Sequence, residues 1–260
     1  LNWNKIEPEP GVFQQAEFDK VREAAKVGPV GLRLLGGSNS PPWLARTVTY
    51  FTYTEGTSGG TFYMPVWWEA EYQHRWEYML RVVEREVGHL VDVFYQTGGA
   101  TVYGEPFIRS PWQNKDAYNN LGFDWAVDRS ALEALYDIAV RVWPRQRIAV
   151  SVFPWQYMKN GQPRSSLGPT SSFILDLMPD LIGANDLRET PGQPRLNTWI
   201  WMEQTGIPLF WQTARPPKIG DWRKALEWTI DFGGEYVELN RDFETYDYAE
   251  LGAWGWELSK

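Results

Sequence analysis

The chain of 260 residues carries a formal net charge of −8 and contains no cysteine. Its length suits one large domain and falls in the range of α/β barrels. The acidic charge and the scattered lysines and arginines argue against a nucleic-acid or membrane-surface partner, because both need a basic surface. Without cysteine there is no disulfide and no cysteine-bound zinc, and the two histidines, His74 and His89, are too far apart for a zincin motif. We therefore expect no metal site and no cofactor.

Helical and strand-like segments alternate along the chain, which predicts an α/β fold with a parallel sheet. Helices are expected at residues 16–27, 69–87, 130–143, 171–178, 195–205 and 222–232. Strands are expected at residues 30–35, 91–97, 148–153, 181–184, 207–211 and 235–239. The pattern from Ser130 to Glu133 is a capping box that predicts a helix start, and Asp221 is expected to cap the last helix. Residues 38–68 are too polar and too interrupted for core elements.

The number of strands bears on how the fold closes. Six strands after residue 28 are two fewer than the eight of a closed barrel, and Leu1 to Ile6 are expected to supply the end of one more. We find no repeat or linker, so the sequence predicts a single domain over residues 1–260. This domain is a (β/α)8 TIM-type barrel that lacks the first β/α unit at its N-terminus. A partial sequence and an unusual closure are the alternatives.

Aromatic residues exceed what core packing requires, with 16 Trp, 13 Tyr and 12 Phe. Seven tryptophans mostly lie beside proline, glycine or polar residues, in loop-like sequence: Trp67, Trp68, Trp112, Trp155, Trp211, Trp254 and Trp256. Sugar rings present flat C–H faces that stack on indole, so this pattern favours an aromatic-lined cleft for carbohydrate. The alternative is that these residues pack the core.

Glu105 follows the strand at 91–97 and is the leading candidate for catalysis. A carboxylate at the C-terminal end of a parallel strand is where α/β barrels keep their catalytic groups. The flanking Tyr103, Pro106 and Phe107 would partly desolvate it, which suits a general acid. The structural alternative is a loop carboxylate paired with Arg109.

Three stretches in fixed order carry a family resemblance: Trp3 to Phe13 (WNKIEPEPGVF), Ser40 to Leu44 (SPPWL) and Tyr103 to Pro106 (YGEP). They resemble segments that follow strands 2, 3 and 4 in the clan A (β/α)8 glycoside hydrolases, most closely the β-galactosidase-like families 42 and 35. The resemblance implies hydrolysis of a β-linked carbohydrate by two carboxylates, with Glu105 as general acid/base. Gly104 stands where those enzymes usually have Asn, and a Gly-Glu pair there looks more like β-amylase-type barrels.

The resemblance aligns the nucleophile position, at the end of strand 7, with Gln212. A neutral amide cannot be the nucleophile, so three explanations stay open. Gln212 is an engineered Glu→Gln change, or it is native and the barrel is a non-catalytic carbohydrate-binding or structural protein. In the third explanation the second carboxylate comes from another strand end, with Glu238 ranked before Glu189. The structural alternatives are a salt bridge to a helix for Glu238 and a solvated loop charge for Glu189.

The remaining candidates surround these carboxylates. Glu7 is expected to hold a loop by hydrogen bonds. Arg33 lies in an apolar strand, where burial without a partner is costly, so it either orients a catalytic carboxylate or pairs with Glu7. Sugar contacts are expected from residues at strand ends: Trp43, Trp155, Gln156, Asn185, Glu189 and Trp211.

The surroundings of the protein are less constrained. No apolar stretch is long enough for a membrane span, no signal peptide is visible, and the chain starts with Leu1 rather than Met. We expect a mature form or a fragment. The compartment and the oligomeric state stay open, with a secreted or extracytoplasmic location preferred.

Overall fold

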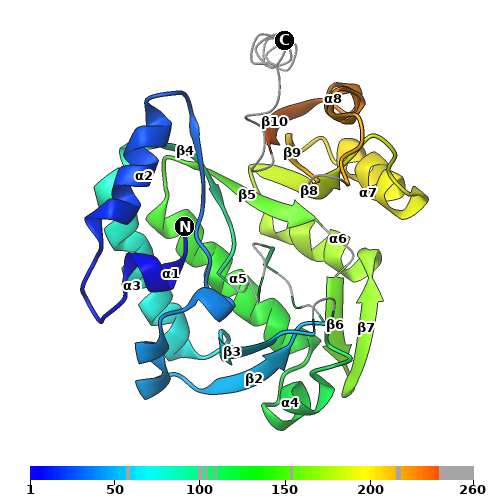
Figure 1. The fold of residues 1–260 in the computed structure, drawn as a ribbon. Coiled ribbons are helices and arrows are strands. Elements are labelled where there is room, and N and C mark those ends of the chain that lie inside the picture. Colours follow the sequence, from blue (N-terminus) through cyan, green and yellow to red (C-terminus); the bar gives the residue numbers. More distant parts are fainter. Residues whose placement is uncertain are drawn as a thin grey trace. The chain divides into compact units, whose positions relative to one another are not determined.

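The computed structural model describes residues 1–56, 59–98, 102, 105–106, 108, 110–152, 155–214 and 218–239. The chain divides into two compact units, whose elements are labelled in Figure 1. Unit 1 comprises Leu1–Ile148 and Pro154–Leu177, and unit 2 comprises Ala149–Phe153 and Met178–Lys260. That residues 1–260 form a single domain stays a prediction, because this depends on whether the two units fold together.

Unit 1 combines helices with a parallel strand pair and two hairpins. Its helices are α1 (Trp3–Ile6), α2 (Gln15–Ala25), α3 (Ala70–Val87), α4 (Lys115–Asn120), α5 (Trp125–Val142) and α6 (Leu167–Leu177), with short 3-10 turns η1 (Gly37–Asn39), η2 (Pro42–Arg46) and η3 (Gly88–Leu90). Strand β1 (Val30–Arg33) pairs in parallel with β4 (Val91–Tyr95). The hairpins are β2 (Tyr50–Thr54) with β3 (Thr61–Pro65), and β6 (Trp155–Lys159) with β7 (Gln162–Ser166).

Helix α3 is amphipathic as predicted, and its buried face forms much of the core of unit 1. Tyr72 and Trp76 are fully buried one turn apart and stack with nearly parallel rings. Trp3 packs edge-on against both of them, with ring centroids 5.6 and 5.3 Å away. The aromatic residues of α1 and α3 therefore join the chain start to this core.

The first residues pair beside β1. Asn2 forms a parallel bridge with Leu35, the amide of Trp3 donates to the carbonyl of Leu35 at 3.0 Å, and the amide of Leu35 donates to the carbonyl of Leu1 at 2.8 Å. The expectation that this segment supplies the end of a strand is confirmed for Leu1 and Asn2. The following residues form the helical turn α1 instead.

The expectation that residues 38–68 lack core elements is wrong, because this stretch contains the hairpin β2–β3. In β2 the side chains alternate in burial, as in a strand with one packed face. Tyr53 on β2, Met64 on β3 and Trp67 after it have no exposed surface. The many threonines and tyrosines that made the segment look polar are good strand residues when every second one is buried.

The predicted start of helix α5 is also wrong. The helix begins at Trp125, and the side chain of Asp124 accepts a hydrogen bond from the amide of Val127 at 3.0 Å. Aspartate is a favoured N-cap residue, and it acts here before the Ser130 pattern is reached. Ser130 therefore lies on the exposed face inside the helix.

Unit 2 is an all-parallel sheet with helical crossovers. Its strands are β5 (Arg147–Val152), β8 (Leu181–Leu187), β9 (Leu209–Thr213) and β10 (Gly234–Glu238), paired in that order. Helix α7 (Gln193–Gln204) joins β8 to β9, and α8 (Trp222–Asp231) joins β9 to β10. Asp221 caps α8 as predicted, accepting from the amide of Arg223 at 3.0 Å. All six predicted strands are confirmed, and none of the described helices is long and apolar enough to cross a membrane.

A buried carboxyl group in α5 is the least favourable polar feature of unit 1. Asp128 is 1% exposed, and within the described part of the chain neither of its carboxyl oxygens has a hydrogen-bond partner. The hydroxyl of Tyr118, also fully buried, is unpartnered among the same residues. Burial raises the pKa of Asp128 well above its usual value, so folding favours the protonated form of this group.

We predict that Asp128→Asn flattens the pH dependence of stability. The unfolded chain releases the Asp128 proton above about pH 4, whereas the folded chain keeps it, so the free energy of unfolding falls as pH rises. The loss is about 1.4 kcal/mol for each unit by which the folded pKa exceeds the unfolded one. Urea unfolding at pH 4, 6 and 8 measures it. As pH rises, the free energy of unfolding of Asp128→Asn should increase relative to that of the wild type. If the two free energies change in parallel with pH, the prediction is contradicted.

Candidate active site

Gln212 and Glu238 meet at the carboxyl ends of adjacent strands. Glu238 is the last residue of β10, and it is the register partner of Gln212 on β9. The Nε2 of Gln212 donates a hydrogen bond to Oε1 of Glu238 at 3.0 Å, and both side chains are half-buried. In parallel α/β sheets, ligands bind at the carboxyl ends of the strands, so this pair stands where a site is expected.

The two faces of β9 have different surroundings. Trp211 packs edge-on against Trp199 of α7, with ring centroids 4.9 Å apart, and lies 6.1 Å from Phe232 after α8. Because successive side chains of a strand point to opposite faces, Gln212 lies on the face turned away from these helices. Its hydrogen bond places Glu238 on the same face.

An apolar floor lies beside this pair. Phe210 is two residues before Gln212 on the same strand face and has no exposed surface. Its ring lies against Gly183 of β8, where an added Cβ would come within 2.4 Å of the ring. Glycine at this position lets the ring cover the neighbouring strand, and the polar pair therefore lies next to a closely packed surface.

The end of β8 bulges beside Gln212. In the pairing with β9, Ala184 matches Trp211 and Leu187 matches Thr213, so Asn185 and Asp186 together stand opposite Gln212. Asp186 has φ +70°, the left-handed region that aspartate tolerates better than most residues. Bulges of this kind occur next to active sites, where they re-aim a side chain. The structure describes the backbone of Asn185 but not its side chain.

Asp186 anchors this bulge to helix α7. Its carboxylate pairs with Arg188 and, at 2.6 Å, with Nη2 of Arg195 in the first turns of α7. Burial raises the pKa of Asp186, but the hydrogen bonds and charges of the two arginines outweigh it and hold the pKa below its usual value. Asp186 was not predicted as a site residue. The Asn-Asp dipeptide at a strand end is the sequence signal that favours such a turn.

Glu189 joins the loop after β8 to the start of α8. Its carboxylate accepts from the amide of Asp221 at 2.9 Å and from Nζ of Lys224 at 3.1 Å. Its carbonyl accepts from Nε1 of Trp228 at 3.1 Å. The hydrogen bond from the Asp221 amide, followed by that from Lys224, lowers the pKa of Glu189. These contacts correspond to the structural alternative, a loop charge with local partners.

Glu105 belongs to unit 1, whereas Gln212 and Glu238 belong to unit 2. Glu105 and Pro106 are buried, and Glu105 is 8% exposed. The described residues do not include the neighbours that were expected to surround Glu105 or pair with it: Tyr103, Gly104, Phe107 and Arg109. Burial of this carboxyl group is compatible with the expected general acid, whose role stays a prediction.

The expectation for Glu7 is confirmed. Its carboxylate accepts from Nε1 of Trp3 at 3.0 Å and from the amide of Gly11 at 2.9 Å, which holds the loop between them. Burial raises the pKa of Glu7 despite these hydrogen bonds.

Two further candidates in unit 1 have identified contacts. Nε1 of Trp43 donates to the carbonyl of Glu7 at 3.0 Å. The guanidinium of Arg33 lies 4.5 Å from the ring centre of Tyr95.

The other predicted sugar contacts divide between two environments. Gln156 on β6 accepts from the amide of Ser110 at 2.7 Å, and the structure describes only the backbone of Trp155 next to it. Trp211 has no exposed surface and is packed between α7 and the end of α8. A fully covered indole cannot stack on a sugar, so we correct this expectation and assign Trp211 to the core of unit 2.

Metal binding finds no support in the described part of the chain, where no group of three or more His, Asp or Glu side chains could hold an ion.

The chemistry available at the ends of β9 and β10 is that of an oriented carboxylate and an amide. The carboxylate can act as nucleophile or base, and the amide can donate to it or to a sugar hydroxyl.

The comparisons with known proteins concern the fold. No protein-family model and no curated protein sequence matches the chain. The catalytic domain of β-amylase from Paenibacillus polymyxa is similar over 99% of this chain and 88% of that chain, at 12% identity and a TM-score of 0.57. A β-galactosidase from the psychrophilic Marinomonas ef1 matches over 92% of this chain and 48% of that chain, at 13% identity and a TM-score of 0.49.

The likeness to β-amylase confirms the predicted fold class. The chain has an α/β fold of the TIM-barrel type, with parallel strands alternating with helices, and the described residues hold fewer parallel strands than the eight of a full barrel. The resemblance to the glycoside hydrolases of clan A is confirmed at the level of fold. β-Amylase is also the kind of barrel that the Gly104-Glu105 pair resembles in sequence.

We predict that Glu189→Gln weakens the folded state without changing the chemistry at β9 and β10. The folded pKa of Glu189 is lowered, so its contribution is present above the unfolded pKa of about 4.3 and is lost as pH falls through the folded value. Thermal unfolding followed by circular dichroism at pH 7 and pH 3 should show a lower midpoint at pH 7 only. An equal deficit at both values would exclude the carboxylate charge as its origin.

Proposed function

We propose that this protein is a glycoside hydrolase acting on a β-linked carbohydrate through two carboxyl groups. Glu105 is the general acid/base, and Glu238 is the second carboxylate, oriented by Gln212. The observation that carries the proposal is the 3.0 Å hydrogen bond from Gln212 to Glu238 at the carboxyl ends of β9 and β10. The β-amylase-like fold supports the class of reaction.

The chemistry assigns a different task to each group. A protonated carboxyl group donates its proton to the leaving oxygen while charge develops on the sugar ring. An ionised carboxylate either attacks the anomeric carbon or activates a water molecule. Glu238 suits the second task because the amide of Gln212 holds one of its oxygens and fixes the direction of the other.

Gln212 then has a positioning role rather than that of a lost nucleophile. A neutral amide has no charge to stabilise an oxocarbenium-like centre, but its N–H groups can hold a neighbouring carboxylate. The bulge of β8 opposite Gln212 adds the backbone of Asn185 to the same strand ends. Polar residues from three consecutive parallel strands thus gather at one edge of the sheet of unit 2.

We predict that Glu105→Gln and Glu238→Gln lower kcat by about 10²–10⁴-fold on aryl β-glycosides with poor leaving groups. The two variants should differ on dinitrophenyl glycosides, whose leaving group departs without a proton. Glu105→Gln should recover most of its rate there, and Glu238→Gln should not. Glu189→Gln is the matched control and should keep the wild-type rate. Equal losses for both variants on both substrates would remove the acid role of Glu105.

We predict that Gln212→Ala lowers kcat by up to about 100-fold, because Glu238 loses the group that orients it. Gln212→Glu places a second negative charge beside Glu238, and like charges favour protonation of one of the pair, so its pH optimum should move upward. Steady-state rates from pH 4 to pH 9 measure both effects. Proton NMR of the first-formed anomer separates retention from inversion.

The second candidate function is a carbohydrate-binding barrel without catalysis. It is favoured by the amide of Gln212 at the position where the resembling hydrolases carry their nucleophile. In this case the wild type cleaves no glycoside and Gln212→Glu gains activity. If neither form cleaves or binds any glycan, both carbohydrate proposals fail.

A further inference from the structure

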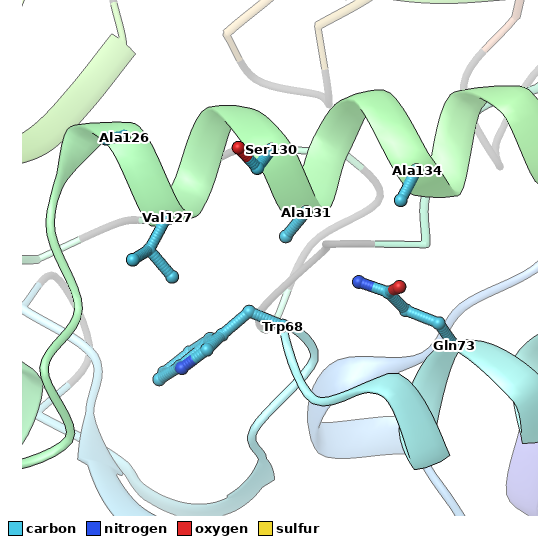
Figure 2. Close-up of a pocket in the computed structure, with 7 residues that line it drawn as sticks. All are labelled: Trp68, Gln73, Ala126, Val127, Ser130, Ala131 and Ala134. Atoms are coloured by element: carbon cyan, nitrogen blue, oxygen red, sulfur yellow. The ribbon is translucent and has the colours of Figure 1, made fainter.

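A pocket in unit 1 is lined by no residue of a parallel strand. Figure 2 shows it between the first half of α5 and the segment that leads into α3. Its volume is about 450 Å³, within the range of about 300–1,000 Å³ of small-ligand sites. It is lined by Trp68, Gln73, Ala126, Val127, Ser130, Ala131 and Ala134.

The space exists because α5 presents small side chains toward Trp68. Three of the lining residues are alanines, at positions 126, 131 and 134 of one helix. In Figure 2 the side chains of Val127 and Ala131 point toward the indole of Trp68, and the amide of Gln73 points toward α5. A larger side chain at Ala134 would fill part of this space.

The indole of Trp68 is held in place from behind. Phe123 lies 4.5 Å away between ring centroids, and Trp67 packs edge-on at 4.8 Å. Trp68 is nevertheless only half-buried, whereas Trp67 has no exposed surface. A fixed and partly exposed aromatic surface binds at a low entropic cost, because no rotamer has to be ordered on binding.

The lining chemistry selects one class of ligand. None of the seven lining residues is charged, so the pocket offers nothing to an anion or a cation. The half-buried Gln73 supplies an amide that hydrogen-bonds to hydroxyl groups, and the exposed Ser130 lies at the edge of the pocket with its hydroxyl turned away from Trp68 (Figure 2). An aromatic surface flanked by neutral donors and acceptors fits a sugar ring, with its apolar C–H face and hydroxyl rim.

We propose that this pocket is a second sugar-binding site, which holds one or two units of a polysaccharide. The proposal rests on the proposed function for the class of ligand. It adds two recognising residues, Trp68 and Gln73, neither of which belongs to the candidate active site. Its role is to retain a long glycan chain.

Native electrophoresis through gels that contain barley β-glucan, birchwood xylan, potato galactan or soluble starch tests the site. We expect retardation by at least one of these polysaccharides. Ala134→Leu, which fills the pocket, and Gln73→Leu, which removes its amide, should each raise the apparent Kd by about tenfold, the effect of losing one or two good contacts. Ala117→Leu on α4 is the matched control and should bind as the wild type does.

The readouts separate this site from the candidate active site. In the hydrolysis of the retarding polysaccharide, both pocket variants should lose more kcat/KM than they lose on a small aryl glycoside. If the polysaccharide retards the wild type more than the pocket variants and no hydrolysis occurs, the result supports sugar binding in the pocket and overturns the catalytic proposal. If both variants are retarded as strongly as the wild type, or if none of the four polysaccharides retards the wild type, the proposal that the pocket binds sugar is overturned. Circular dichroism of each variant identifies one that fails to fold, and the other then decides.

Discussion

The hydrogen bond from Gln212 to Glu238 depends on the register of β9 against β10, since a slip of one residue would send the two side chains to opposite faces. Trp211 contributes to this register. A Cβ added at Gly234 would lie 2.4 Å from its indole nitrogen, so the ring packs over the start of β10 only where that strand has glycine. The indole that we had expected to contact sugar therefore stabilises the arrangement of the polar pair from the other face of the sheet.

In unit 1 the first two of the three motifs that carry the family resemblance are joined to each other. Glu7 accepts from Trp3 and Gly11, and its carbonyl accepts from Trp43 of the second motif. Trp3 and Glu7 are buried and Trp43 is half-buried, and their hydrogen bonds hold these two loops together. Their recurrence in sequence therefore reflects how these loops are built. The third motif contains Glu105, and the proposed chemistry depends on that residue together with Gln212 and Glu238.

The parallel strands were predictable from the sequence mainly because they are short and largely apolar, and β5 and β9 have mostly buried side chains. The β2–β3 hairpin was not, because its tyrosines and threonines bury only alternate side chains. Glu238 was identified as a strand-end carboxylate, but its contact with Gln212 spans 26 residues and depends on a register that no local pattern encodes. Exposure was the weakest inference. Nearby polar residues, Glu69 for Trp67 and Gln212 for Trp211, made these tryptophans look accessible, yet both are fully buried.

Strand β5 gives unit 2 an unusual chain order. The strand pairs with β8 along Ala149 to Val152, yet more than twenty residues assigned to unit 1 separate the two in sequence. During synthesis β5 leaves the ribosome before β8 does, so the edge of β5 that pairs with β8 has no partner until β8 has been made. A fragment that began at Met178 would leave the N–H and C=O groups along β8 open to pairing with another chain, the usual start of edge-to-edge aggregation. The sheet that carries Gln212 and Glu238 therefore cannot be cut out as a simple C-terminal piece.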